Sequence, residues 1–106
     1  MNLESLKKRV QPDTIIDDQE IIAGFVDDWT RRFRGHTSVV AIPRSTSEVA
    51  EILKWCSSNQ VSVVPQGGNT GMVGGGVPMN GELILSLRRM NRVDFVDGPI
   101  PHIIAQ

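Results

Sequence analysis

The sequence has little cysteine and histidine and no tyrosine. Its 106 residues include one cysteine, Cys56, and two histidines, His36 and His102. A single cysteine cannot form a disulfide within the chain, so we expect a reducing compartment and a cytoplasmic protein. It also excludes a metal centre built on several cysteines, and the two histidines lie too far apart in the chain to share a ligand motif. The sequence therefore predicts no metal site.

Long apolar runs and a charge imbalance are also missing. No apolar run approaches the roughly 20 residues that a membrane-spanning helix needs, and residues 1–10 lack the apolar core of a signal peptide. With a formal net charge of −1 and 5% aromatic residues, nothing favours nucleic acid or an anionic membrane as a partner. The 40% hydrophobic and 22% charged residues are typical of one small globular domain.

Helical periodicity dominates the first third of the chain. Apolar residues recur at spacings of three and four over residues 2–10, which predicts a short helix. A second helix is expected to begin at Asp17 or Asp18, whose carboxylate can cap its first turn, and to end at Gly35. We therefore expect an N-terminal helical segment over residues 1–35.

Strand and helix patterns alternate in the next part of the chain. Residues 38–43 are rich in β-branched residues and end in proline, which predicts a strand. Ser45 and Glu48 predict a capping box, in which each side chain bonds the other's backbone N–H, at the start of a helix that reaches about Ser58. The nearly continuous apolar run at 61–64 predicts a parallel strand that is covered on both faces.

Three more strands are expected towards the end of the sequence. Asn80-Gly81 is a strong turn signal, and it precedes an apolar strand at 82–87. Further strands are expected to start at Val93 and Ile100. These patterns predict an α+β fold (α/β-like), in which N-terminal helices precede a β-α-β-loop-β unit with a mixed sheet.

Several chemically notable residues have plain structural interpretations. The helix over residues 45–58 places Cys56 on its apolar stripe, which predicts a buried structural thiol. Trp29 and Trp55 are expected to be packing residues. The arginines at 88, 89 and 92 are interpreted as a solvated basic turn, with a contact to a domain interface or a cofactor phosphate as the alternative.

A glycine-rich loop lies between the strands expected at 61–64 and 82–87. Residues 65–78 hold six of the ten glycines of the chain. They do not form a Walker loop, because no lysine follows Lys54, and they lack the Gly-x-Gly-x-x-Gly spacing before a helix that marks a Rossmann site. The loop returns to a strand, so its backbone N–H groups could form an anion-binding nest. The alternative is a long loop that uses glycine for tight turns alone.

Two stretches of this sequence closely resemble a known flavoprotein family. They are Pro65-Gln66-Gly67-Gly68-Asn69-Thr70-Gly71-Met72-Val73-Gly74-Gly75 and Glu82-Leu83-Ile84-Leu85-Ser86-Leu87-Arg88-Arg89-Met90-Asn91. They resemble the FAD-binding domain of the vanillyl-alcohol oxidase type (PCMH-type). Within it, the sequence is most similar to FAD-linked 2-hydroxyacid dehydrogenases, namely D-2-hydroxyglutarate dehydrogenase, D-lactate dehydrogenase and the glycolate oxidase subunit. The resemblance spans roughly residues 14–97.

The resemblance implies that FAD is the cofactor and that the loop backbone wraps its diphosphate. The implied cofactor-binding residues are Pro65, Gln66, Gly67, Gly68, Asn69, Thr70, Gly71, Met72, Gly74 and Gly75. Asn69 stands where relatives with covalently attached flavin often carry histidine, so non-covalent FAD is expected. The implied reaction oxidises a D-2-hydroxy acid, of the lactate, glycolate or 2-hydroxyglutarate class, to the 2-oxo acid. No catalytic residue is carried over.

The resemblance also implies that much of the flavoenzyme is missing. Residues 36–106 would form the first FAD-binding subdomain, in incomplete form, and the chain stops inside an expected strand. The expected partner is the rest of the flavoenzyme chain, with a second FAD subdomain and a substrate domain. Alone, the chain is expected to be inactive, and its exposed sheet edges favour self-association. The alternative is a stand-alone nucleotide- or anion-binding module, or an inactive truncated remnant.

Overall fold

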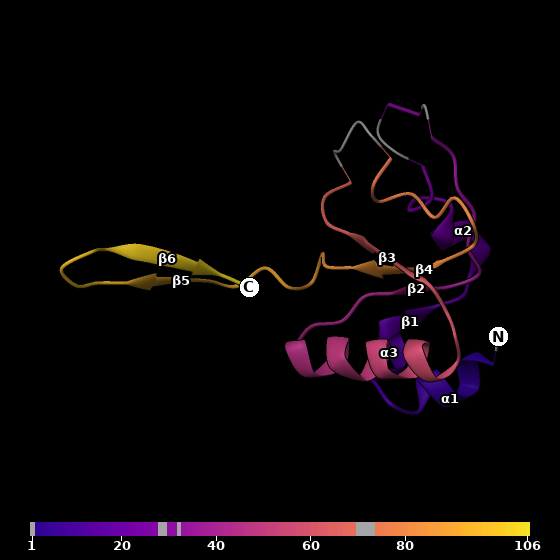
Figure 1. Cartoon of the computed structure of the whole chain (residues 1–106), viewed down its shortest axis with the longest axis horizontal. Coiled ribbons are helices and arrows are strands. Elements are labelled where there is room, and N and C mark those ends of the chain that lie inside the picture. The colour runs from indigo at the N-terminus through magenta and orange to yellow at the C-terminus, as the bar shows by residue number, and fades with distance from the viewer. Residues whose placement is uncertain (1, 28–29, 32, 70–73) are drawn as a thin grey trace.

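The computed structural model describes residues 2–27, 30–31, 33–69 and 74–106. It confirms the predicted α+β fold with a mixed sheet (Figure 1). The helices are α1 (Leu3–Lys7), α2 (Gln19–Ile22) and α3 (Thr46–Ser58), with a 3-10 turn at Pro12–Thr14. The strands are β1 (Ile15–Ile16), β2 (Val40–Ala41), β3 (Val63–Gln66), β4 (Leu83–Ser86), β5 (Val93–Val96) and β6 (His102–Ala105).

The main sheet has four strands in the order β1-β2-β4-β3. β2, β4 and β3 run parallel, whereas β1 pairs with β2 in the antiparallel direction. Helix α3 connects β2 to β3, as predicted, but β4 lies between these two strands. β3 therefore sits at the edge of the sheet, and this position tolerates Pro65, which has no backbone N–H to donate.

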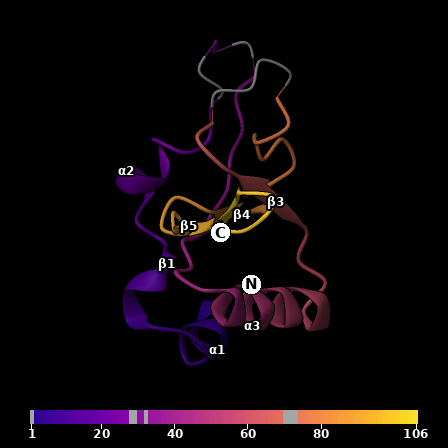
Figure 2. The ribbon, with the colours of Figure 1, turned by 90° about the vertical axis from the view of Figure 1, so that its left-hand side faces the viewer.

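Each face of the sheet has its own apolar core. Leu83 and Leu85 point towards α3, where they join Ile52, Trp55 and Cys56. Ile84, between them, points to the opposite face, where Ile22 and Phe25 pack. The alternation follows from the period of two along a strand. Figure 2 shows α1 and α3 on one side of the sheet and α2 on the other.

The buried thiol of Cys56 agrees with its predicted structural role. Its side chain is buried in the core under α3, and this burial raises the pKa of the thiol. Trp55 is also buried, and its indole N–H donates to the hydroxyl of Ser5 at 2.8 Å. Leu53, on the same helix, is 42% exposed.

The start of α3 differs from the predicted capping box. The hydroxyl of Ser45 accepts from the N–H of Glu48 at 3.3 Å, as expected. The carboxylate of Glu48 does not return this bond to Ser45 but accepts from the N–H of Arg44 at 2.9 Å. It also accepts from the Gln11 N–H and the Thr14 hydroxyl, so it joins α3 to the 3-10 turn.

The second predicted helix is much shorter than expected. It begins after Asp18, whose carboxylate caps it as predicted, but it ends at Ile22. Beyond it, Asp27 and Arg34 form an isolated antiparallel bridge, and the Gly35 N–H donates to Val26. These contacts within residues 26–35 replace the helix that the local pattern predicted. The predicted packing residue Trp29 lies outside the described residues.

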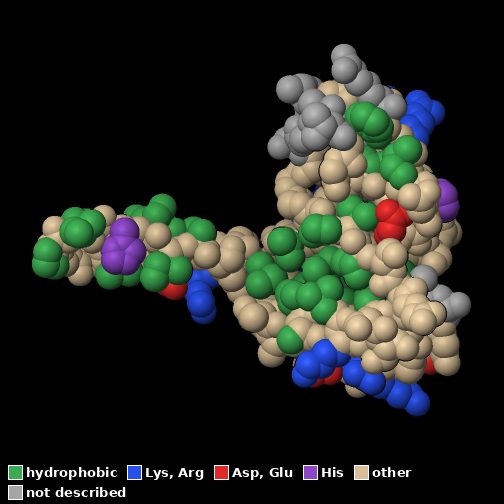
Figure 3. Space-filling view, in the orientation of Figure 1, with side chains coloured by type: hydrophobic (Ala, Val, Ile, Leu, Met, Phe, Trp, Pro, Cys, Tyr) green, Lys and Arg blue, Asp and Glu red, His purple; other side chains and the backbone are tan. Residues whose placement is uncertain are grey.

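The last two strands form an antiparallel hairpin that is separate from the main sheet. Figure 1 shows this hairpin, in yellow, extending away from the body of the protein. Its apolar side chains are exposed: Phe95 is 82% and Ile103 60% exposed, and the two face each other across the hairpin. Figure 3 shows apolar side chains along it.

Candidate functional site

The glycine loop leaves the sheet at the carboxyl end of β3. Hydrogen bonding between β3 and the chain of β4 continues beyond the last paired residues, because the Leu87 N–H donates to the carbonyl of Gln66 at 2.9 Å. The loop thus starts where two parallel strands end side by side, which is the edge of an α/β sheet that commonly binds ligands. Three of the predicted site residues, Thr70, Gly71 and Met72, lie outside the described residues.

Three glycines of the loop face open space. Among the residues that the structure describes, a Cβ placed at Gly67, Gly68 or Gly75 would meet no heavy atom within 4 Å. The bare backbone at these positions leaves room for an anion to approach the N–H groups. The structure is therefore compatible with a loop that binds a diphosphate, and a side chain at any of the three would occupy that room.

Positive φ angles occur at other positions of the loop than Gly67 and Gly68. Gly74 has φ = 77° and Asn69 has φ = 58°. A Cβ at Gly74 would also lie 2.8 Å from Cγ of Phe33, so glycine is required there both by conformation and by space. Asparagine is among the few other residues that tolerate the left-handed region.

The side-chain amides of Gln66 and Asn69 bind the protein's own backbone. Nδ2 of Asn69 donates to the carbonyl of Asp27 at 2.7 Å. Nε2 of Gln66 donates to the carbonyl of Phe25 at 2.7 Å and to that of Gly76 at 2.9 Å. Sequence reasoning placed both amides near the cofactor but missed Phe25 and Asp27, because no local pattern marks a backbone carbonyl as a partner.

Two buried polar atoms beside the loop have no hydrogen-bond partner in the described part of the chain. They are Oε1 of Gln66 and Oγ of Ser86, and the two residues are paired across β3 and β4. Buried polar groups are nearly always paired with protein, water or a ligand. These two atoms therefore mark a polar position on the same face of the sheet as Phe25.

The basic turn after β4 is largely exposed at Arg88 and Arg92, as predicted, and Arg89 is partly buried. The guanidinium of Arg88 lies 4.4 Å from the centroid of the Phe25 ring. Nη1 of Arg89 donates to the carbonyls of Asp13 and Ile42. Arg88 places a positive charge just beyond the carboxyl end of β4, which favours an anion in the neighbourhood of the glycine loop.

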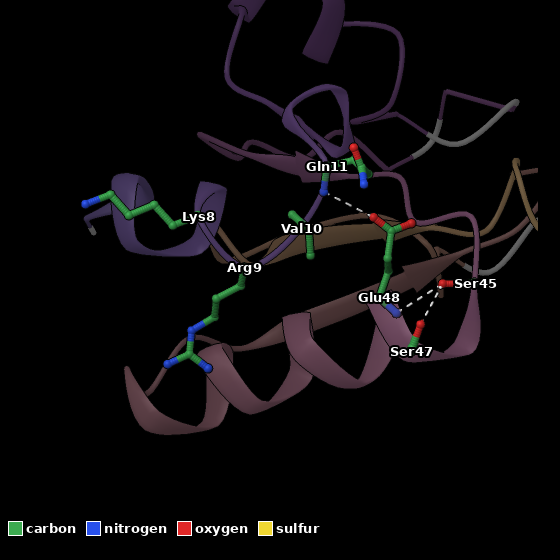
Figure 4. A pocket seen from close by; sticks show the side chains of 7 residues that line it. All are labelled: Lys8, Arg9, Val10, Gln11, Ser45, Ser47 and Glu48. Carbon is green, nitrogen blue, oxygen red and sulfur yellow. Dashed lines mark hydrogen bonds between the residues drawn. The ribbon is translucent and has the colours of Figure 1, made fainter.

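A hollow in the surface lies far from the glycine loop, at the start of α3. Its volume is about 510 Å³, and it is lined by Lys8, Arg9, Val10, Gln11, Ser45, Ser47 and Glu48. Figure 4 shows the carboxylate of Glu48 directed towards Gln11, with Lys8 pointing away. The carboxylate already accepts hydrogen bonds from the protein, so this hollow does not compete with the loop as an anion site.

Clusters able to hold a metal ion and helices able to cross a membrane are both absent from the residues that the structure describes. No group of three or more His, Cys, Asp or Glu side chains is arranged to hold a metal ion. No helix in this part of the chain combines the length and the apolar character that crossing a bilayer requires.

Comparison with known proteins identifies the region that contains the loop. A family model described as "FAD binding domain" matches residues 37–99. D-2-hydroxyglutarate dehydrogenase of Bos taurus, which is mitochondrial, is 48% identical over 86 residues, covering 81% of this chain and 16% of the relative. D-2-hydroxyglutarate–pyruvate transhydrogenase of Saccharomyces cerevisiae is 45% identical over 86 residues, covering 78% of this chain and 17% of the relative.

Solved structures share the fold at lower identity. Alkyldihydroxyacetonephosphate synthase matches with a TM-score of 0.75 and 23% identity, over 90% of this chain and 21% of that chain. p-Cresol methylhydroxylase matches with a TM-score of 0.71 and 16% identity, over 90% of this chain and 19% of that chain. At these identities the likeness concerns the fold, and it agrees with the predicted flavoprotein architecture.

These comparisons confirm FAD as the cofactor and correct one expectation. The relatives from Bos taurus and Oryza sativa and a putative D-lactate dehydrogenase of Schizosaccharomyces pombe are mitochondrial. The cytoplasmic prediction, which rested on a single cysteine, is therefore wrong, and the relatives point to mitochondria. The chain spans only 14% to 17% of the length of the curated relatives that it matches.

Proposed function

Because this chain belongs to the family of FAD-binding domains, we propose that its glycine loop holds the diphosphate of FAD. The proposed site contains seven described residues: Pro65, Gln66, Gly67, Gly68, Asn69, Gly74 and Gly75. It also includes Thr70, Gly71 and Met72, which the resemblance implies. The observation that carries the proposal is the open space in front of the backbone at Gly67, Gly68 and Gly75. When bound, FAD supplies two-electron oxidation chemistry.

The protein's part in this site is to bind and orient. Bare N–H groups can approach phosphate oxygens closely and donate to them. The nearby guanidinium of Arg88, held over the ring of Phe25, adds positive charge without a lysine in the loop. Loop residues reach the FAD diphosphate through backbone rather than side chains, which agrees with Asn69 and Gln66 donating to protein carbonyls.

We further propose that FAD is held without a covalent bond. Asn69 occupies the position where the resemblance places the histidine that bears flavin in some relatives. A carboxamide nitrogen has little nucleophilic character, because its lone pair is delocalised into the carbonyl. In the structure this nitrogen also donates a hydrogen bond to Asp27.

For the whole protein we propose the oxidation of a D-2-hydroxy acid to the 2-oxo acid. This proposal rests on relatives that are 38% to 48% identical and that are named D-2-hydroxyglutarate or D-lactate dehydrogenases. The candidate substrates are acids of the 2-hydroxyglutarate, lactate and glycolate class. Residues 36–106 would supply the first FAD-binding subdomain, with residues 1–35 as the segment before it.

The hairpin of β5 and β6 supports a partner within a larger flavoenzyme. An isolated two-stranded hairpin is marginally stable in water, and this one exposes Phe95 and Ile103 on one face. We propose that the rest of the flavoenzyme packs on this hairpin. In the isolated chain the same apolar surface would favour self-association.

The cofactor proposal can be tested by flavin release. The purified full-length protein is incubated with FAD, desalted and then denatured, and the flavin in solution is measured by absorbance. We expect about one flavin per protein, released on denaturation. Flavin that stays with the precipitated protein would contradict the non-covalent assignment. Absence of retained flavin would contradict the FAD site itself and would favour a module for another nucleotide or anion.

A further inference from the structure

We infer that residues 25–27 and 33–35, here called the supporting segment, are a working part of the flavin site. This inference rests on the proposed role of the glycine loop. The supporting segment precedes the family match at 37–99 and was expected to be part of a separate helical segment. Gln66 and Asn69 are assigned as positioning residues, whose amides hold the glycine loop against the supporting segment.

The first support is a pair of amide-to-carbonyl bonds at the start of the loop. Asn69 donates to the carbonyl of Asp27, 42 positions earlier, and Gln66 donates to that of Phe25, 41 positions earlier. Gln66 is buried and spans two segments at once, because the same nitrogen also donates to Gly76. The beginning and the end of the loop are thereby joined to the supporting segment through one side chain.

The second support is the packing of the far end of the loop. Gly74 lies so close to the ring of Phe33 that any added Cβ would clash at 2.8 Å. Further along, the His36 N–H donates to the carbonyl of Pro78 at 2.9 Å, directly after the supporting segment. Both ribbon views show the chain around these residues meeting at the end of the molecule that lies opposite α1 (Figures 1 and 2).

The supporting segment is itself closed into a fixed shape. Asp27 and Arg34 form an antiparallel bridge, and the Gly35 N–H donates to Val26 at 2.9 Å. The Asp27 carbonyl therefore has a defined position for the Asn69 amide. Because Asn69 adopts φ = 58°, a conformation that most residues avoid, the bond to Asp27 helps to keep the loop in this shape.

The consequence for the cofactor is preorganisation. Backbone donors that are already held in place lose less conformational entropy when an anion binds. Removing the amide of Asn69 should therefore weaken the binding of the diphosphate while leaving the N–H donors themselves present. The affinity for a ligand without the diphosphate should not change, because such a ligand does not accept hydrogen bonds from these N–H groups.

The test compares Asn69→Gly with Asn59→Gly in the full-length protein. Glycine removes the amide of Asn69 but accepts its positive φ, so the backbone conformation stays allowed. Asn59 offers a matched control: its Nδ2 also donates to one backbone carbonyl, that of Trp55, at 2.8 Å. Asn59 ends α3, on the opposite side of the sheet from the supporting segment.

The first measurement is hydrogen exchange of the cofactor-free protein. We expect the loop amides around Gly67, Gly68 and Gly75 to exchange about tenfold faster in Asn69→Gly, and unchanged in Asn59→Gly. Equal exchange in the two variants would overturn the supporting role. This measurement needs no flavin, so it tests whether Asn69 holds the loop even if the protein proves not to bind FAD.

The second measurement compares FAD with riboflavin, which lacks the diphosphate, by flavin fluorescence. We expect Asn69→Gly to weaken FAD binding about tenfold, equivalent to about 1.4 kcal/mol, and riboflavin binding to be unchanged. Equal weakening of both flavins would show a general structural role and overturn the positioning role. If the unaltered protein binds neither flavin, the proposed function fails, and with it the cofactor part of this inference.

Discussion

The side-chain amide of Gln66 donates a hydrogen bond of 2.7 Å to the backbone carbonyl of Phe25, which lies 41 positions earlier. This bond joins the end of an edge strand to a segment outside the matched domain. Its neighbour in the sheet, Ser86, is equally buried, yet its hydroxyl has no hydrogen-bond partner among the described residues. Substitutions at Gln66 and Ser86 can therefore compare a side chain that donates hydrogen bonds with a hydroxyl that has none in the described structure.

Gln66→Met should destabilise the cofactor-free protein by about 1–3 kcal/mol, because the buried carbonyl of Phe25 and the partly buried carbonyl of Gly76 lose their donor. Ser86→Ala should change the free energy of unfolding by less than about 0.5 kcal/mol, or raise it, because no bond is lost. Urea unfolding of both variants measures the difference. A cost for Ser86→Ala as large as that for Gln66→Met would show that the Ser86 hydroxyl has a partner in solution.

Gly68→Val should weaken FAD binding by about tenfold or more, because the branched side chain fills the space in front of the loop backbone. The expected loss of affinity comes from the volume of the valine side chain and not from backbone strain, because Gly68 does not have a positive φ. Gly98→Val is the matched control, because a Cβ at Gly98 also meets no atom of the described residues within 4 Å but lies in the hairpin. Flavin titration should separate the two variants, and equal affinities would refute the role of Gly68.

Gly35→Ala should destabilise the protein by about 1–3 kcal/mol through overpacking. A Cβ at this position would lie 2.6 Å from the carbonyl oxygen of Pro78, which already accepts from His36. Gly24→Ala serves for comparison, because its Cβ would meet the Ile21 carbonyl at an ordinary 3.6 Å. Thermal unfolding should give a lower midpoint for Gly35→Ala alone, and a tolerated alanine there would contradict the packing.

Stability should fall at acidic pH in part through Glu48. The Arg44 N–H, donating to its carboxylate, is the main reason that the pKa of Glu48 lies below its ordinary value of 4.5. The folded protein therefore binds this proton more weakly than the unfolded chain. The contribution is present above the unfolded pKa and is lost as the pH falls through the folded pKa.

Glu48→Gln should therefore destabilise the protein at about pH 7, and the difference from the unaltered protein should shrink towards about pH 3. Urea unfolding across this range gives the comparison. Glu51→Gln is the control on the same helix, because the Glu51 carboxylate only forms ion pairs at 3.8 Å. A pH profile of Glu48→Gln parallel to that of the unaltered protein would contradict the assigned role.

Replacing Phe95 and Ile103 together by serine should reduce self-association of the 106-residue chain, because the exposed apolar face of the hairpin is lost. Sedimentation velocity at several concentrations measures the effect. Leu53→Ser removes an exposed apolar side chain from α3 instead and should leave association unchanged. Similar association of all three proteins would exclude the hairpin as the contact surface.

Much of the fold could be predicted because its determinants are local. The apolar stripe and the cap at Ser45 define α3, and the predicted strands near 63, 83, 93 and 102 are all present. The end of α2 could not be predicted, because the residues after it form the Asp27–Arg34 bridge and bonds to Gln66 and Asn69 that no local pattern marks. The predicted site residues have open space at Gly67, Gly68 and Gly75, but the contacts of the loop with Phe25, Asp27 and Phe33 join residues about 40 positions apart.

By itself, the sequence determined the glycine loop, the strand–helix–strand unit before it and the resemblance to FAD-binding domains, because glycine spacing and apolar periodicity are local properties. Only the tertiary structure decided that β4 lies between β2 and β3, that the last hairpin leaves the sheet, and that the loop amides bind the supporting segment. Strand order and carbonyl partners depend on how distant segments share one core, and no local pattern records that choice.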